Sequence, residues 1–423
     1  MKVGSSGRIS ETWPRPEEAE MHVLLVADGR SPHTLGWIRG LLGIGIRTTL
    51  LSSRRLDEVE REAFGELSKR CLVYEPDDLW NRLRPALAKL RPRVDAMRPR
   101  QMLSRANGQQ PNRMQRIEES ADLAAAYRLG TFLRRLLPSV APDVVHALRI
   151  QYEAIAAVSA KIELPLAVST WGSDLITTAA ISPELNTNTR RAVESADFMF
   201  SDCERDAELA DSFGLRPGVP KLVVPGNFGL DFDNFPEADR GYLYSFGLVA
   251  RPLVTYPRGI RGCIDPEALV GAFISLVESG VDASFLAVGL NPAVDSARQI
   301  PGTFSCTSKL SHDAMLRIAA ISSVTVSPST SDGVPNSVLE GMAGGSIPVC
   351  GDLASLREVE RKGAVMVWCD PADPRSIADG VKVALRLASD PENPIRNMTV
   401  ARQHYSTSSA QANVRQAYLG MLR

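Results

Sequence analysis

The chain has 423 residues, which predicts two or three domains, and its 44% hydrophobic and 23% charged content is ordinary for a soluble globular protein. A formal net charge of −1 gives no overall reason to bind nucleic acid, and no stretch approaches the ~18 apolar residues of a transmembrane helix. The 6 cysteines are scattered without a C-x-x-C pair, which favours reduced thiols in a cytoplasmic protein over disulfides or a zinc site.

The first residues predict a flexible extension followed by a Rossmann-like domain. Residues 1–20 are polar and acid-rich without an apolar core, so we expect a loose extension and not a signal peptide. Residues 22–26 form a continuous, mainly apolar run typical of a buried parallel strand. A turn, a helix over residues 32–43 and a strand over residues 47–52 follow. This order of elements opens a doubly wound sheet.

The same alternation continues as far as residue 230, so residues 21–230 are predicted to form the first domain. Further strands are expected at residues 71–75, 143–147, 165–171, 198–202 and 221–225. Helical patterns fill residues 152–161, 184–196 and 204–213.

A basic segment over residues 82–116 interrupts this pattern, with ten basic residues and a single acid, Asp95. Its prolines and a glycine predict a helix to about Leu90 and then a mobile arm. The segment is either a solvated basic loop or a surface for an acidic lipid or an acceptor phosphate. The basic residues are Arg82, Arg84, Lys89, Arg91, Arg93, Arg98, Arg100, Arg105, Arg113 and Arg116.

A second domain is expected over residues 231–395, after a hinge near residues 227–237. Its first strand is predicted at residues 242–250, followed by a loop rich in arginine. Later helices are expected at residues 267–279, 313–321 and 374–387, and further strands at residues 285–288 and 364–369. A last helical stretch, broken near residues 405–408, predicts that residues 396–423 return to the first domain.

Residues 324–349 form the most informative stretch of the chain. A β-branched strand over residues 324–326 leads into a loop of Ser, Asp, Gly and Pro, and a short helix is predicted from Asn336 to Ala343. Residues 347–350 read as the next strand. Because the first amides of a helix are unpaired and its dipole is positive there, this helix start predicts an anion site.

Two acids flank the predicted anion site. Asp332 lies in the loop and Glu340 one turn into the helix, with seven residues between them. A carboxylate accepts two hydrogen bonds side by side, which suits the adjacent hydroxyls of a ribose or a hexose. One acid for each sugar of a nucleotide-sugar is one interpretation. The other is a Rossmann-type β-loop-α unit whose acids are a cap and a solvated face.

This stretch resembles the donor-site signature of retaining GT-B glycosyltransferases, especially glycosyltransferase family 4. The matching positions are Pro328-Ser329, Asp332-Gly333, Pro335, Glu340 and the run from Ala343 to Val349. Asp332 is a departure, because the family more often has the longer Glu there. That difference leaves the sugar-side contact and the identity of the donor open.

The resemblance implies an α/β protein of GT-B fold, with two Rossmann-like doubly wound domains facing a central cleft. It implies that two cations in the loop after residue 250 clamp the donor diphosphate. Arg251 matches the first cation, while Arg258 and Arg261, each followed by Gly, both fit the second. It further implies catalytic roles for Asp332, Arg251 and Arg261, and donor contacts by Glu340, Gly333, Asn336, Ser337, Val338 and Arg258.

Four residues of the first domain are expected at the acceptor or sugar side. His33 follows the first strand, and the loop after residue 168 carries Trp171, Gly172 and Asp174. Relatives often have His-Gly where this chain has Trp171-Gly172, although a subset reads Trp-Gly-Ser-Asp. Because Trp cannot act as a base, catalysis cannot use an imidazole at this position, and no other side chain stands out as a general base. The leaving phosphate itself could take the acceptor proton. The alternative interpretation of His33 is a surface histidine, and that of Trp171 is an aromatic residue that caps the sheet.

The resemblance thus implies a metal-independent, retaining transfer from a nucleotide-sugar to a hydroxyl acceptor, with no cofactor besides this co-substrate. The acceptor could be lipid-linked, in surface polysaccharide or glycolipid assembly, with residues 82–116 on an anionic membrane face. Such a protein would be cytoplasmic or peripheral at the inner face of the membrane. Two alternatives stay open. One is a weak or inactive sugar-nucleotide-binding scaffold; the other is a sugar-nucleotide epimerase, which would need additional acids in the cleft.

Overall fold

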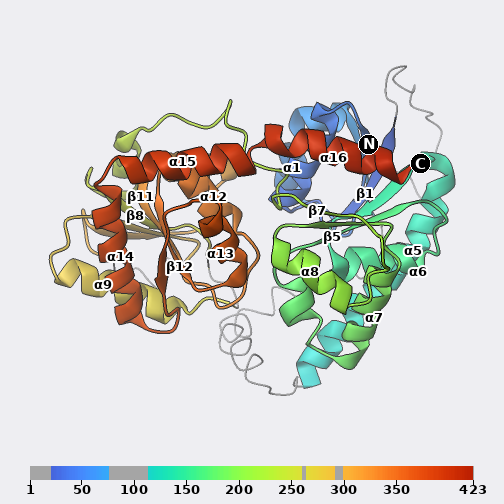
Figure 1. The fold of residues 1–423 in the computed structure, drawn as a ribbon, viewed down its shortest axis with the longest axis horizontal. Coiled ribbons are helices and arrows are strands. Elements are labelled where there is room, and N and C mark those ends of the chain that lie inside the picture. The colour runs from blue at the N-terminus through green and yellow to red at the C-terminus, as the bar shows by residue number, and fades with distance from the viewer. Residues whose placement is uncertain (1–20, 76–112, 260–262, 291–298, 423) are drawn as a thin grey trace.

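The structure is a computed structural model that describes residues 21–75, 113–259, 263–290 and 299–422. Two lobes, each with a parallel sheet, lie side by side (Figure 1). The sheets have the strand orders β3-β2-β1-β4-β5-β6-β7 and β10-β9-β8-β11-β12-β13. In each sheet the order reverses beside the first strand of the lobe, which is the doubly wound arrangement that the alternating sequence pattern predicts.

The first sheet is buried on both faces because helices cover it on either side. Its strands are β1 (His22–Ala27), β2 (Arg47–Ser52), β3 (Cys71–Tyr74), β4 (Val144–Ala147), β5 (Leu166–Thr170), β6 (Phe198–Ser201) and β7 (Lys221–Val223). The helices are α1 (Pro32–Gly43), α2 (Glu58–Phe64), α5 (Arg113–Val140), α6 (Ile155–Ser159), α7 (Pro183–Glu194) and α8 (Glu204–Ser212), with short turns η1 (Gly65–Lys69), η3 (Ile150–Ala154) and η4 (Asp174–Thr178).

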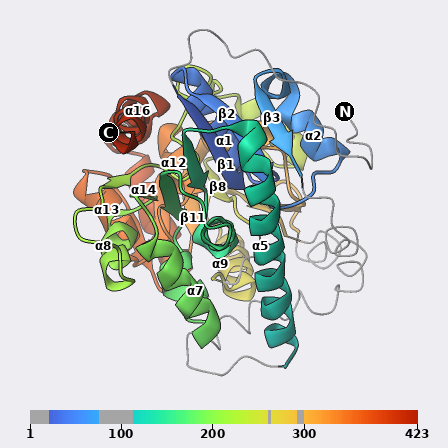
Figure 2. The same cartoon turned by 90° about the vertical axis from the view of Figure 1, so that its right-hand side faces the viewer.

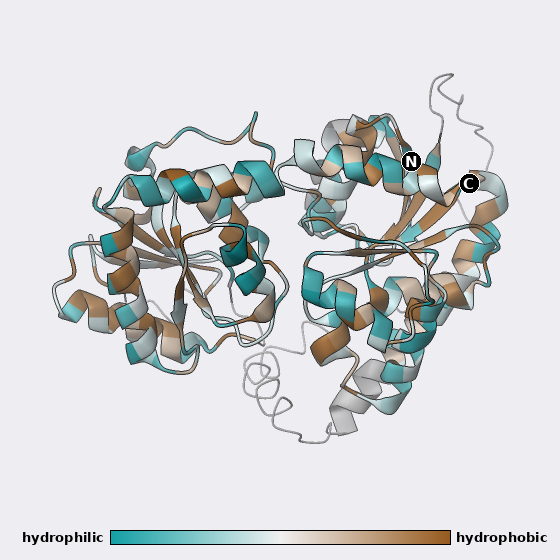
Figure 3. Ribbon diagram, in the orientation of Figure 1, coloured by the Kyte–Doolittle hydropathy of each residue, from teal (hydrophilic) through white to brown (hydrophobic). Residues whose placement is uncertain are grey.

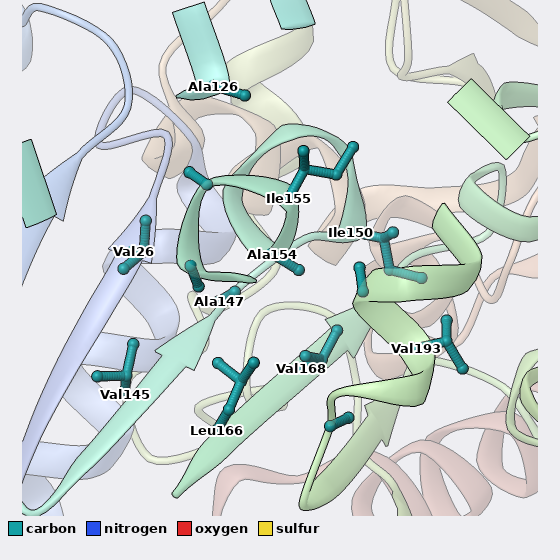
Figure 4. Packing of buried hydrophobic residues seen from close by; sticks show 14 of the residues in the cluster. Val26, Ala126, Val145, Ala147, Ile150, Ala154, Ile155, Leu166, Val168 and Val193 are labelled. Atoms are coloured by element: carbon teal, nitrogen blue, oxygen red, sulfur yellow. The ribbon is translucent and has the colours of Figure 1, made fainter. Parts of the chain in front are cut away.

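One face of this sheet packs under α5, α6 and α7 (Figures 2 and 4). Val26, Val145 and Val168, from three neighbouring strands, gather there with Ile155 and Val193 of the helices (Figure 4). The brown strands inside and the teal outer faces of the helices show the same division of apolar and polar residues in both lobes (Figure 3). None of the helices in the described parts of the chain is long and apolar enough to cross a membrane.

The second sheet has a core of its own and the same architecture. Its strands are β8 (Leu253–Tyr256), β9 (Ser284–Val288), β10 (Phe304–Thr307), β11 (Ser322–Ser327), β12 (Ile347–Gly351) and β13 (Val367–Cys369). Its helices are α9 (Pro266–Glu278), α11 (His312–Ile321), α12 (Asn336–Ala343), α13 (Ala354–Arg361), α14 (Pro374–Ala388) and α15 (Glu392–Tyr405), preceded by the turn η5 (Arg240–Phe246). Side chains of Asp265, Ser311 and Asp373 accept from the first amides of α9, α11 and α14, which fixes where those helices begin.

The strand predicted at residues 242–250 is wrong, because most of that segment lies in η5. Asp239 accepts a hydrogen bond from Gly241 N at 2.9 Å, and the Tyr242 and Phe246 rings pack at 5.2 Å, so the segment is stabilised as a tight turn. The first strand of the second sheet is the four-residue β8, which pairs in parallel with both β9 and β11. The loop after this strand therefore begins at Pro257 and not at Arg251.

The last two helices cross from the second lobe to the first (Figure 1). α15 ends at Tyr405 and α16 (Thr407–Met421) begins two residues later, at the predicted break. Leu230 N donates to Tyr405 O at 2.8 Å, and Thr407 N donates to Leu230 O at 2.9 Å, so the crossing is tied to the hinge. Ala410, Val414, Ala417 and Tyr418 of α16 then join the apolar cluster of the first lobe.

Candidate functional site

The candidate site begins at the loop between β11 and the start of α12. Pro335 precedes the helix in an extended conformation, and the amides of Val338 and Leu339 both donate to its carbonyl, at 3.0 and 3.3 Å. The amides of Asn336 and Ser337 have no hydrogen-bond partner in the described parts of the chain. The predicted anion contact thus fits Asn336 and Ser337. It does not fit Val338, whose amide is occupied and whose side chain is fully buried.

Several polar atoms of this loop and helix start are buried without a partner among the described residues. They are Ser327 Oγ, Ser331 Oγ, Asn336 Oδ1 and Ser337 Oγ. A buried polar atom left unsatisfied costs roughly 1–3 kcal/mol. Four such atoms within eleven residues indicate a place that a polar ligand would complete.

Glu340 lies beside this group of unpartnered atoms, with only 7% of its surface exposed. It lines a small cavity with Ser337, Thr255 and Met315. Burial raises the pKa of Glu340, whereas the neighbouring His312 and Arg258 act to lower it. His312 Nδ1 lies 3.9 Å from Glu340 Oε1. A carboxylate at the wall of a small cavity, next to free helix-start amides, can bind the hydroxyls of a sugar whose phosphates lie on those amides.

Arg258 is the second residue after β8 and lies at the carboxyl end of the sheet, with only 9% of its side chain exposed. Its guanidinium forms a salt bridge with Asp332 Oδ2 and reaches Ser329 Oγ at 3.3 Å. The other Asp332 oxygen accepts from Gly333 N at 3.0 Å. The predicted sugar contact Asp332 is thus engaged by Arg258 and by the backbone of its own loop.

Arg251 is placed wrongly by the sequence prediction. It precedes β8, so it lies at the amino edge of the sheet, opposite to the edge where α12 begins. The Nε of Arg251 lies 3.2 Å from Oδ1 of Asp282, which precedes β9 in the chain, and 45% of the Arg251 side chain is exposed. Arg258 therefore takes the position after the first strand that was assigned to Arg251. Arg261 lies outside the described residues, as does nearly all of the basic segment 82–116.

The expected acceptor-side residues meet the donor loop across the domain boundary. The rings of His33 and Trp171 lie 4.6 Å apart, and His33 Nδ1 is 3.2 Å from Asn336 Nδ2 of the second domain. Gly172 has a φ of +31°, and a Cβ there would lie 2.2 Å from Gly333 N. The loops after β5 and β11 therefore touch at a point where only glycine fits.

Asp174 has a different place from the one predicted. Its carboxylate is fully buried and accepts from Arg149 Nε at 2.9 Å, Trp171 N at 3.3 Å and Ile150 N at 3.4 Å. It therefore fixes the loop that carries Trp171 and Gly172.

Asp202 is a further candidate site residue, which the sequence pattern did not predict. A Cβ on Gly333 would lie 2.2 Å from Asp202 Oδ2, and Gly172 N donates to Asp202 Oδ1 at 3.3 Å. Burial, followed by the charge of Asp206, raises the pKa of Asp202 well above its ordinary value. Its place directly after β6, at the carboxyl edge of the first sheet, is the signal that could have found it.

Asp202, Cys203 and Asp206 also form a group of possible metal ligands whose donor atoms lie within 4.8 Å of one another. Arg205, however, binds Asp206 Oδ1 at 2.7 Å, and burial raises the pKa of the Cys203 thiol. A neutral thiol and a carboxylate already paired with a guanidinium are poor ligands. The donor set therefore favours an ion-paired network over a bound metal.

Comparison with known proteins agrees with the architecture. Residues 265–386 match the family model of group 1 glycosyl transferases. A search of curated proteins finds no match to the chain. Among solved structures, HepE of Anabaena in complex with UDP and glucose is similar with a TM-score of 0.63 and 11% identity, over 95% of this chain and 100% of that one.

Two further structures widen this comparison. Sucrose-phosphate synthase from Thermosynechococcus elongatus has a TM-score of 0.67 and 10% identity, over 95% of this chain and 99% of that one. A putative UDP-N-acetylglucosamine 2-epimerase from Listeria monocytogenes has a TM-score of 0.61 and 14% identity, over 95% of this chain and 96% of that one. The predicted GT-B fold is confirmed. Both a synthase and an epimerase have it, so the chemistry has to be argued from the site.

Proposed function

We propose that this protein is a retaining, metal-independent glycosyltransferase that moves a sugar from a nucleotide-diphosphate-sugar to a hydroxyl acceptor. The observation that carries this proposal is the grouping of Glu340, Arg258 and the unpartnered polar atoms near Ser337 around one helix start. The match of residues 265–386 to group 1 glycosyl transferases supports it. So does the contact of this loop with His33 and Gly172 of the other domain.

Each group has a distinct task in the proposed reaction. Glu340 accepts hydrogen bonds from adjacent ribose hydroxyls, while the amides of Asn336 and Ser337 meet the diphosphate. Arg258 exchanges its partner Asp332 for the diphosphate, which frees that carboxylate for hydroxyls of the transferred sugar. The bond from the sugar's anomeric carbon to the phosphate oxygen breaks as the bond to the acceptor oxygen forms. The leaving phosphate takes the acceptor proton on the same face of the sugar.

A screen against UDP-, GDP-, dTDP- and CMP-sugars tests this proposal. Thermal shift identifies the donor that binds, and turnover is then followed as release of nucleoside diphosphate in the presence of acceptor alcohols. Glu340→Gln should weaken donor binding, while Glu278→Gln, at the exposed end of α9, should not. Binding of a donor without release of nucleotide under any condition would contradict transfer and support a scaffold.

A sugar-nucleotide epimerase is a second candidate, and Asp202 is the observation that favours it. An epimerase needs further acids at the cleft, and Asp202 lies against Gly333, beside the proposed sugar position. The two activities differ without an acceptor. An epimerase changes the stereochemistry of the donor sugar, which NMR detects, whereas a transferase leaves the sugar unchanged or hydrolyses it slowly.

The acceptor is proposed to be lipid-linked, in surface polysaccharide or glycolipid assembly at the cytoplasmic face of a membrane. The ten-to-one excess of basic residues in segment 82–116 motivates this part. Flotation with anionic vesicles should recover the protein at low salt and lose it at high salt. Equal recovery with neutral vesicles, or no loss after Arg91, Arg93, Arg98 and Arg100 are changed to Gln, argues for a soluble acceptor instead.

A further inference from the structure

Arg205, at the start of α8 in the first domain, joins the two loops that meet between the domains. Its Nη2 donates to Gly172 O at 2.9 Å within its own domain. Its Nη1 donates to Asp332 O of the other domain at 2.7 Å. Its Nε donates to the fully buried Asp206 at 2.7 Å, which holds the guanidinium plane in place. One rigid side chain thus holds two backbone carbonyls, from different domains, in a fixed relation.

The helix that carries Arg205 also depends on the second domain. The residue before α8, Cys203, offers no side-chain hydrogen bond to the helix start. Glu358 of α13 supplies the missing partner, because its two carboxylate oxygens accept from Glu204 N at 2.8 Å and from Arg205 N at 2.9 Å. Glu358 is only 3% exposed. A helix cap contributed by another domain is lost when the domains separate.

Asp332 is the residue through which these contacts reach the candidate site. Its carbonyl oxygen accepts from Arg205 and also from Ser355 Oγ, at 2.8 Å, while its carboxylate holds Arg258. Since the backbone of Asp332 fixes where its side chain and the Gly333 amide lie, a shift of this backbone would move both. Arg205 itself is only 16% exposed and touches backbone carbonyls and Asp206. It would therefore act through the loop and not on the donor.

We propose that Arg205 is a positioning residue that couples closure of the two domains to the placement of the Asp332–Gly333 loop, with Glu358 as its counterpart on the second domain. The catalytic part of this inference rests on the proposed glycosyl transfer. The structural part, that Arg205 and Glu358 hold the domains closed, does not. In the closed arrangement, Gly172, Gly333 and Asp332 lie where sugar and acceptor would meet, and this arrangement requires both contacts.

Two variants and one matched control test the coupling. Arg205→Ala should lower kcat about tenfold or more, because two charge-assisted hydrogen bonds to carbonyls are lost. The donor Kd, measured by calorimetry, should stay within about threefold, since donor contacts are made by the second domain. Arg205→Lys, which keeps the charge and one bond, should recover part of kcat. Arg216→Ala is the control, because Arg216 also binds a carbonyl and a carboxylate, Ala196 O and Asp197, but within one domain.

Small-angle X-ray scattering gives a readout that does not need activity. Arg205→Ala and Glu358→Ala should both increase the radius of gyration of the whole chain, while Arg216→Ala should match the wild type. If Arg205→Ala does not fold, Glu358→Ala still tests the contact from the other domain. Wild-type scattering by both variants would overturn the inference, as would an unchanged kcat or a donor Kd that rises by as large a factor as kcat falls. A wild-type protein that transfers no sugar would refute the proposed function but leave the scattering test intact.

Discussion

The two domains hold their polar groups in different ways at the place where they meet. On the donor side, residues 327–337 leave Ser331 Oγ and Ser337 Oγ buried without a partner among the described residues. On the acceptor side, charged groups at the strand ends bind one another, as Arg149 binds Asp174 at 2.9 Å. Unpartnered buried atoms occur on the acceptor side too, at Gln151 Oε1 and Thr170 Oγ1, but in the described parts of the chain only the proposed donor side gathers four of them in one loop and helix start. That gathering is where we expect a ligand to supply polar atoms.

This difference predicts which substitutions change function and which change stability. Changes in the donor loop, or where the first domain touches it, should alter binding and turnover. Changes in internal pairs of the first domain that lie away from this contact should alter stability and leave the chemistry intact.

The contact between Gly172 and Gly333 should be the most sensitive point. Gly172→Ala would place a Cβ 2.2 Å from Gly333 N, so the two loops must move apart by about an ångström or more. A displacement of this size at reacting groups reduces turnover by about 100-fold. Gly218→Ala is the control, since Gly218 also has a positive φ, +86°, but open space around it. Steady-state kinetics should show a loss of kcat only for Gly172→Ala, and equal losses in both variants would assign the effect to backbone strain.

Arg258 should have the next largest effect. Arg258→Ala removes the positive charge that would face the leaving diphosphate, and it leaves the Asp332 carboxylate unpaired. Removing one donor that stabilises developing charge lowers kcat about 100-fold, and the repulsion from Asp332 should also weaken donor binding. Arg258→Lys should recover only part of this loss, because a lysine lacks the planar fork. A variant with full kcat and only a raised KM would show that Arg258 acts in the ground state alone.

Donor affinity should depend on pH through Glu340. Burial raises the pKa of this carboxyl above its ordinary 4.5, so in the free protein it takes up a proton at a higher pH than an exposed glutamate. The carboxylate is the form that accepts two hydroxyl hydrogen bonds, so donor affinity should fall as pH decreases through the raised pKa. Calorimetric titration at several pH values should show this fall. Glu340→Gln should bind about tenfold more weakly at neutral pH and lose the pH dependence.

The sequence predicts more of the proposed donor site than of the contacts between the domains, because the donor site is built from one short stretch of the chain. The donor loop, its helix and both acids lie within residues 324–349. Their sequence spacing therefore determines their arrangement in space once the strand and the helix have formed. The helix predicted from Asn336 to Ala343 has these bounds in the structure. The anion site at its start also agrees with the free amides and hydroxyls found there.

The contacts between the domains could not be predicted in this way. Arg205 is separated by 127 positions from Asp332, and Glu358 by 154 positions from Glu204. No local pattern encodes such distances. Arg251 was misplaced for a local reason, since residues 242–250 have an apolar alternation that suits a strand as well as the turn η5. With the first strand at β8, the residue in the loop after that strand is Arg258, which is therefore the proposed diphosphate contact in place of Arg251.

A buried pair in the first domain should affect stability alone. His146 is fully buried between Tyr418 Oη, at 2.5 Å, and Ser169 Oγ, at 2.8 Å, and burial lowers its pKa from 6.5 to about 3. The stabilisation is complete above pH 6.5 and is lost as pH falls from there toward 3. Each pH unit in this window should remove about 1.4 kcal/mol of unfolding free energy. His146→Gln should flatten this slope in urea unfolding, with kcat unchanged at neutral pH.

Arg251→Ala should have the smallest effect, and this outcome separates the structure from the sequence pattern. The sequence alone assigns Arg251 to the diphosphate clamp, whereas the structure places it at the amino edge of the second sheet, paired with the exposed Asp282. A solvent-exposed ion pair contributes about 0–1 kcal/mol, so kcat, KM and melting temperature should all stay near wild type. Asp282→Ala should behave in the same way. If Arg251→Ala instead lost kcat as Arg258→Ala is expected to, the loop after β8 would not be the clamp, and the assignment of Arg258 would have to be withdrawn.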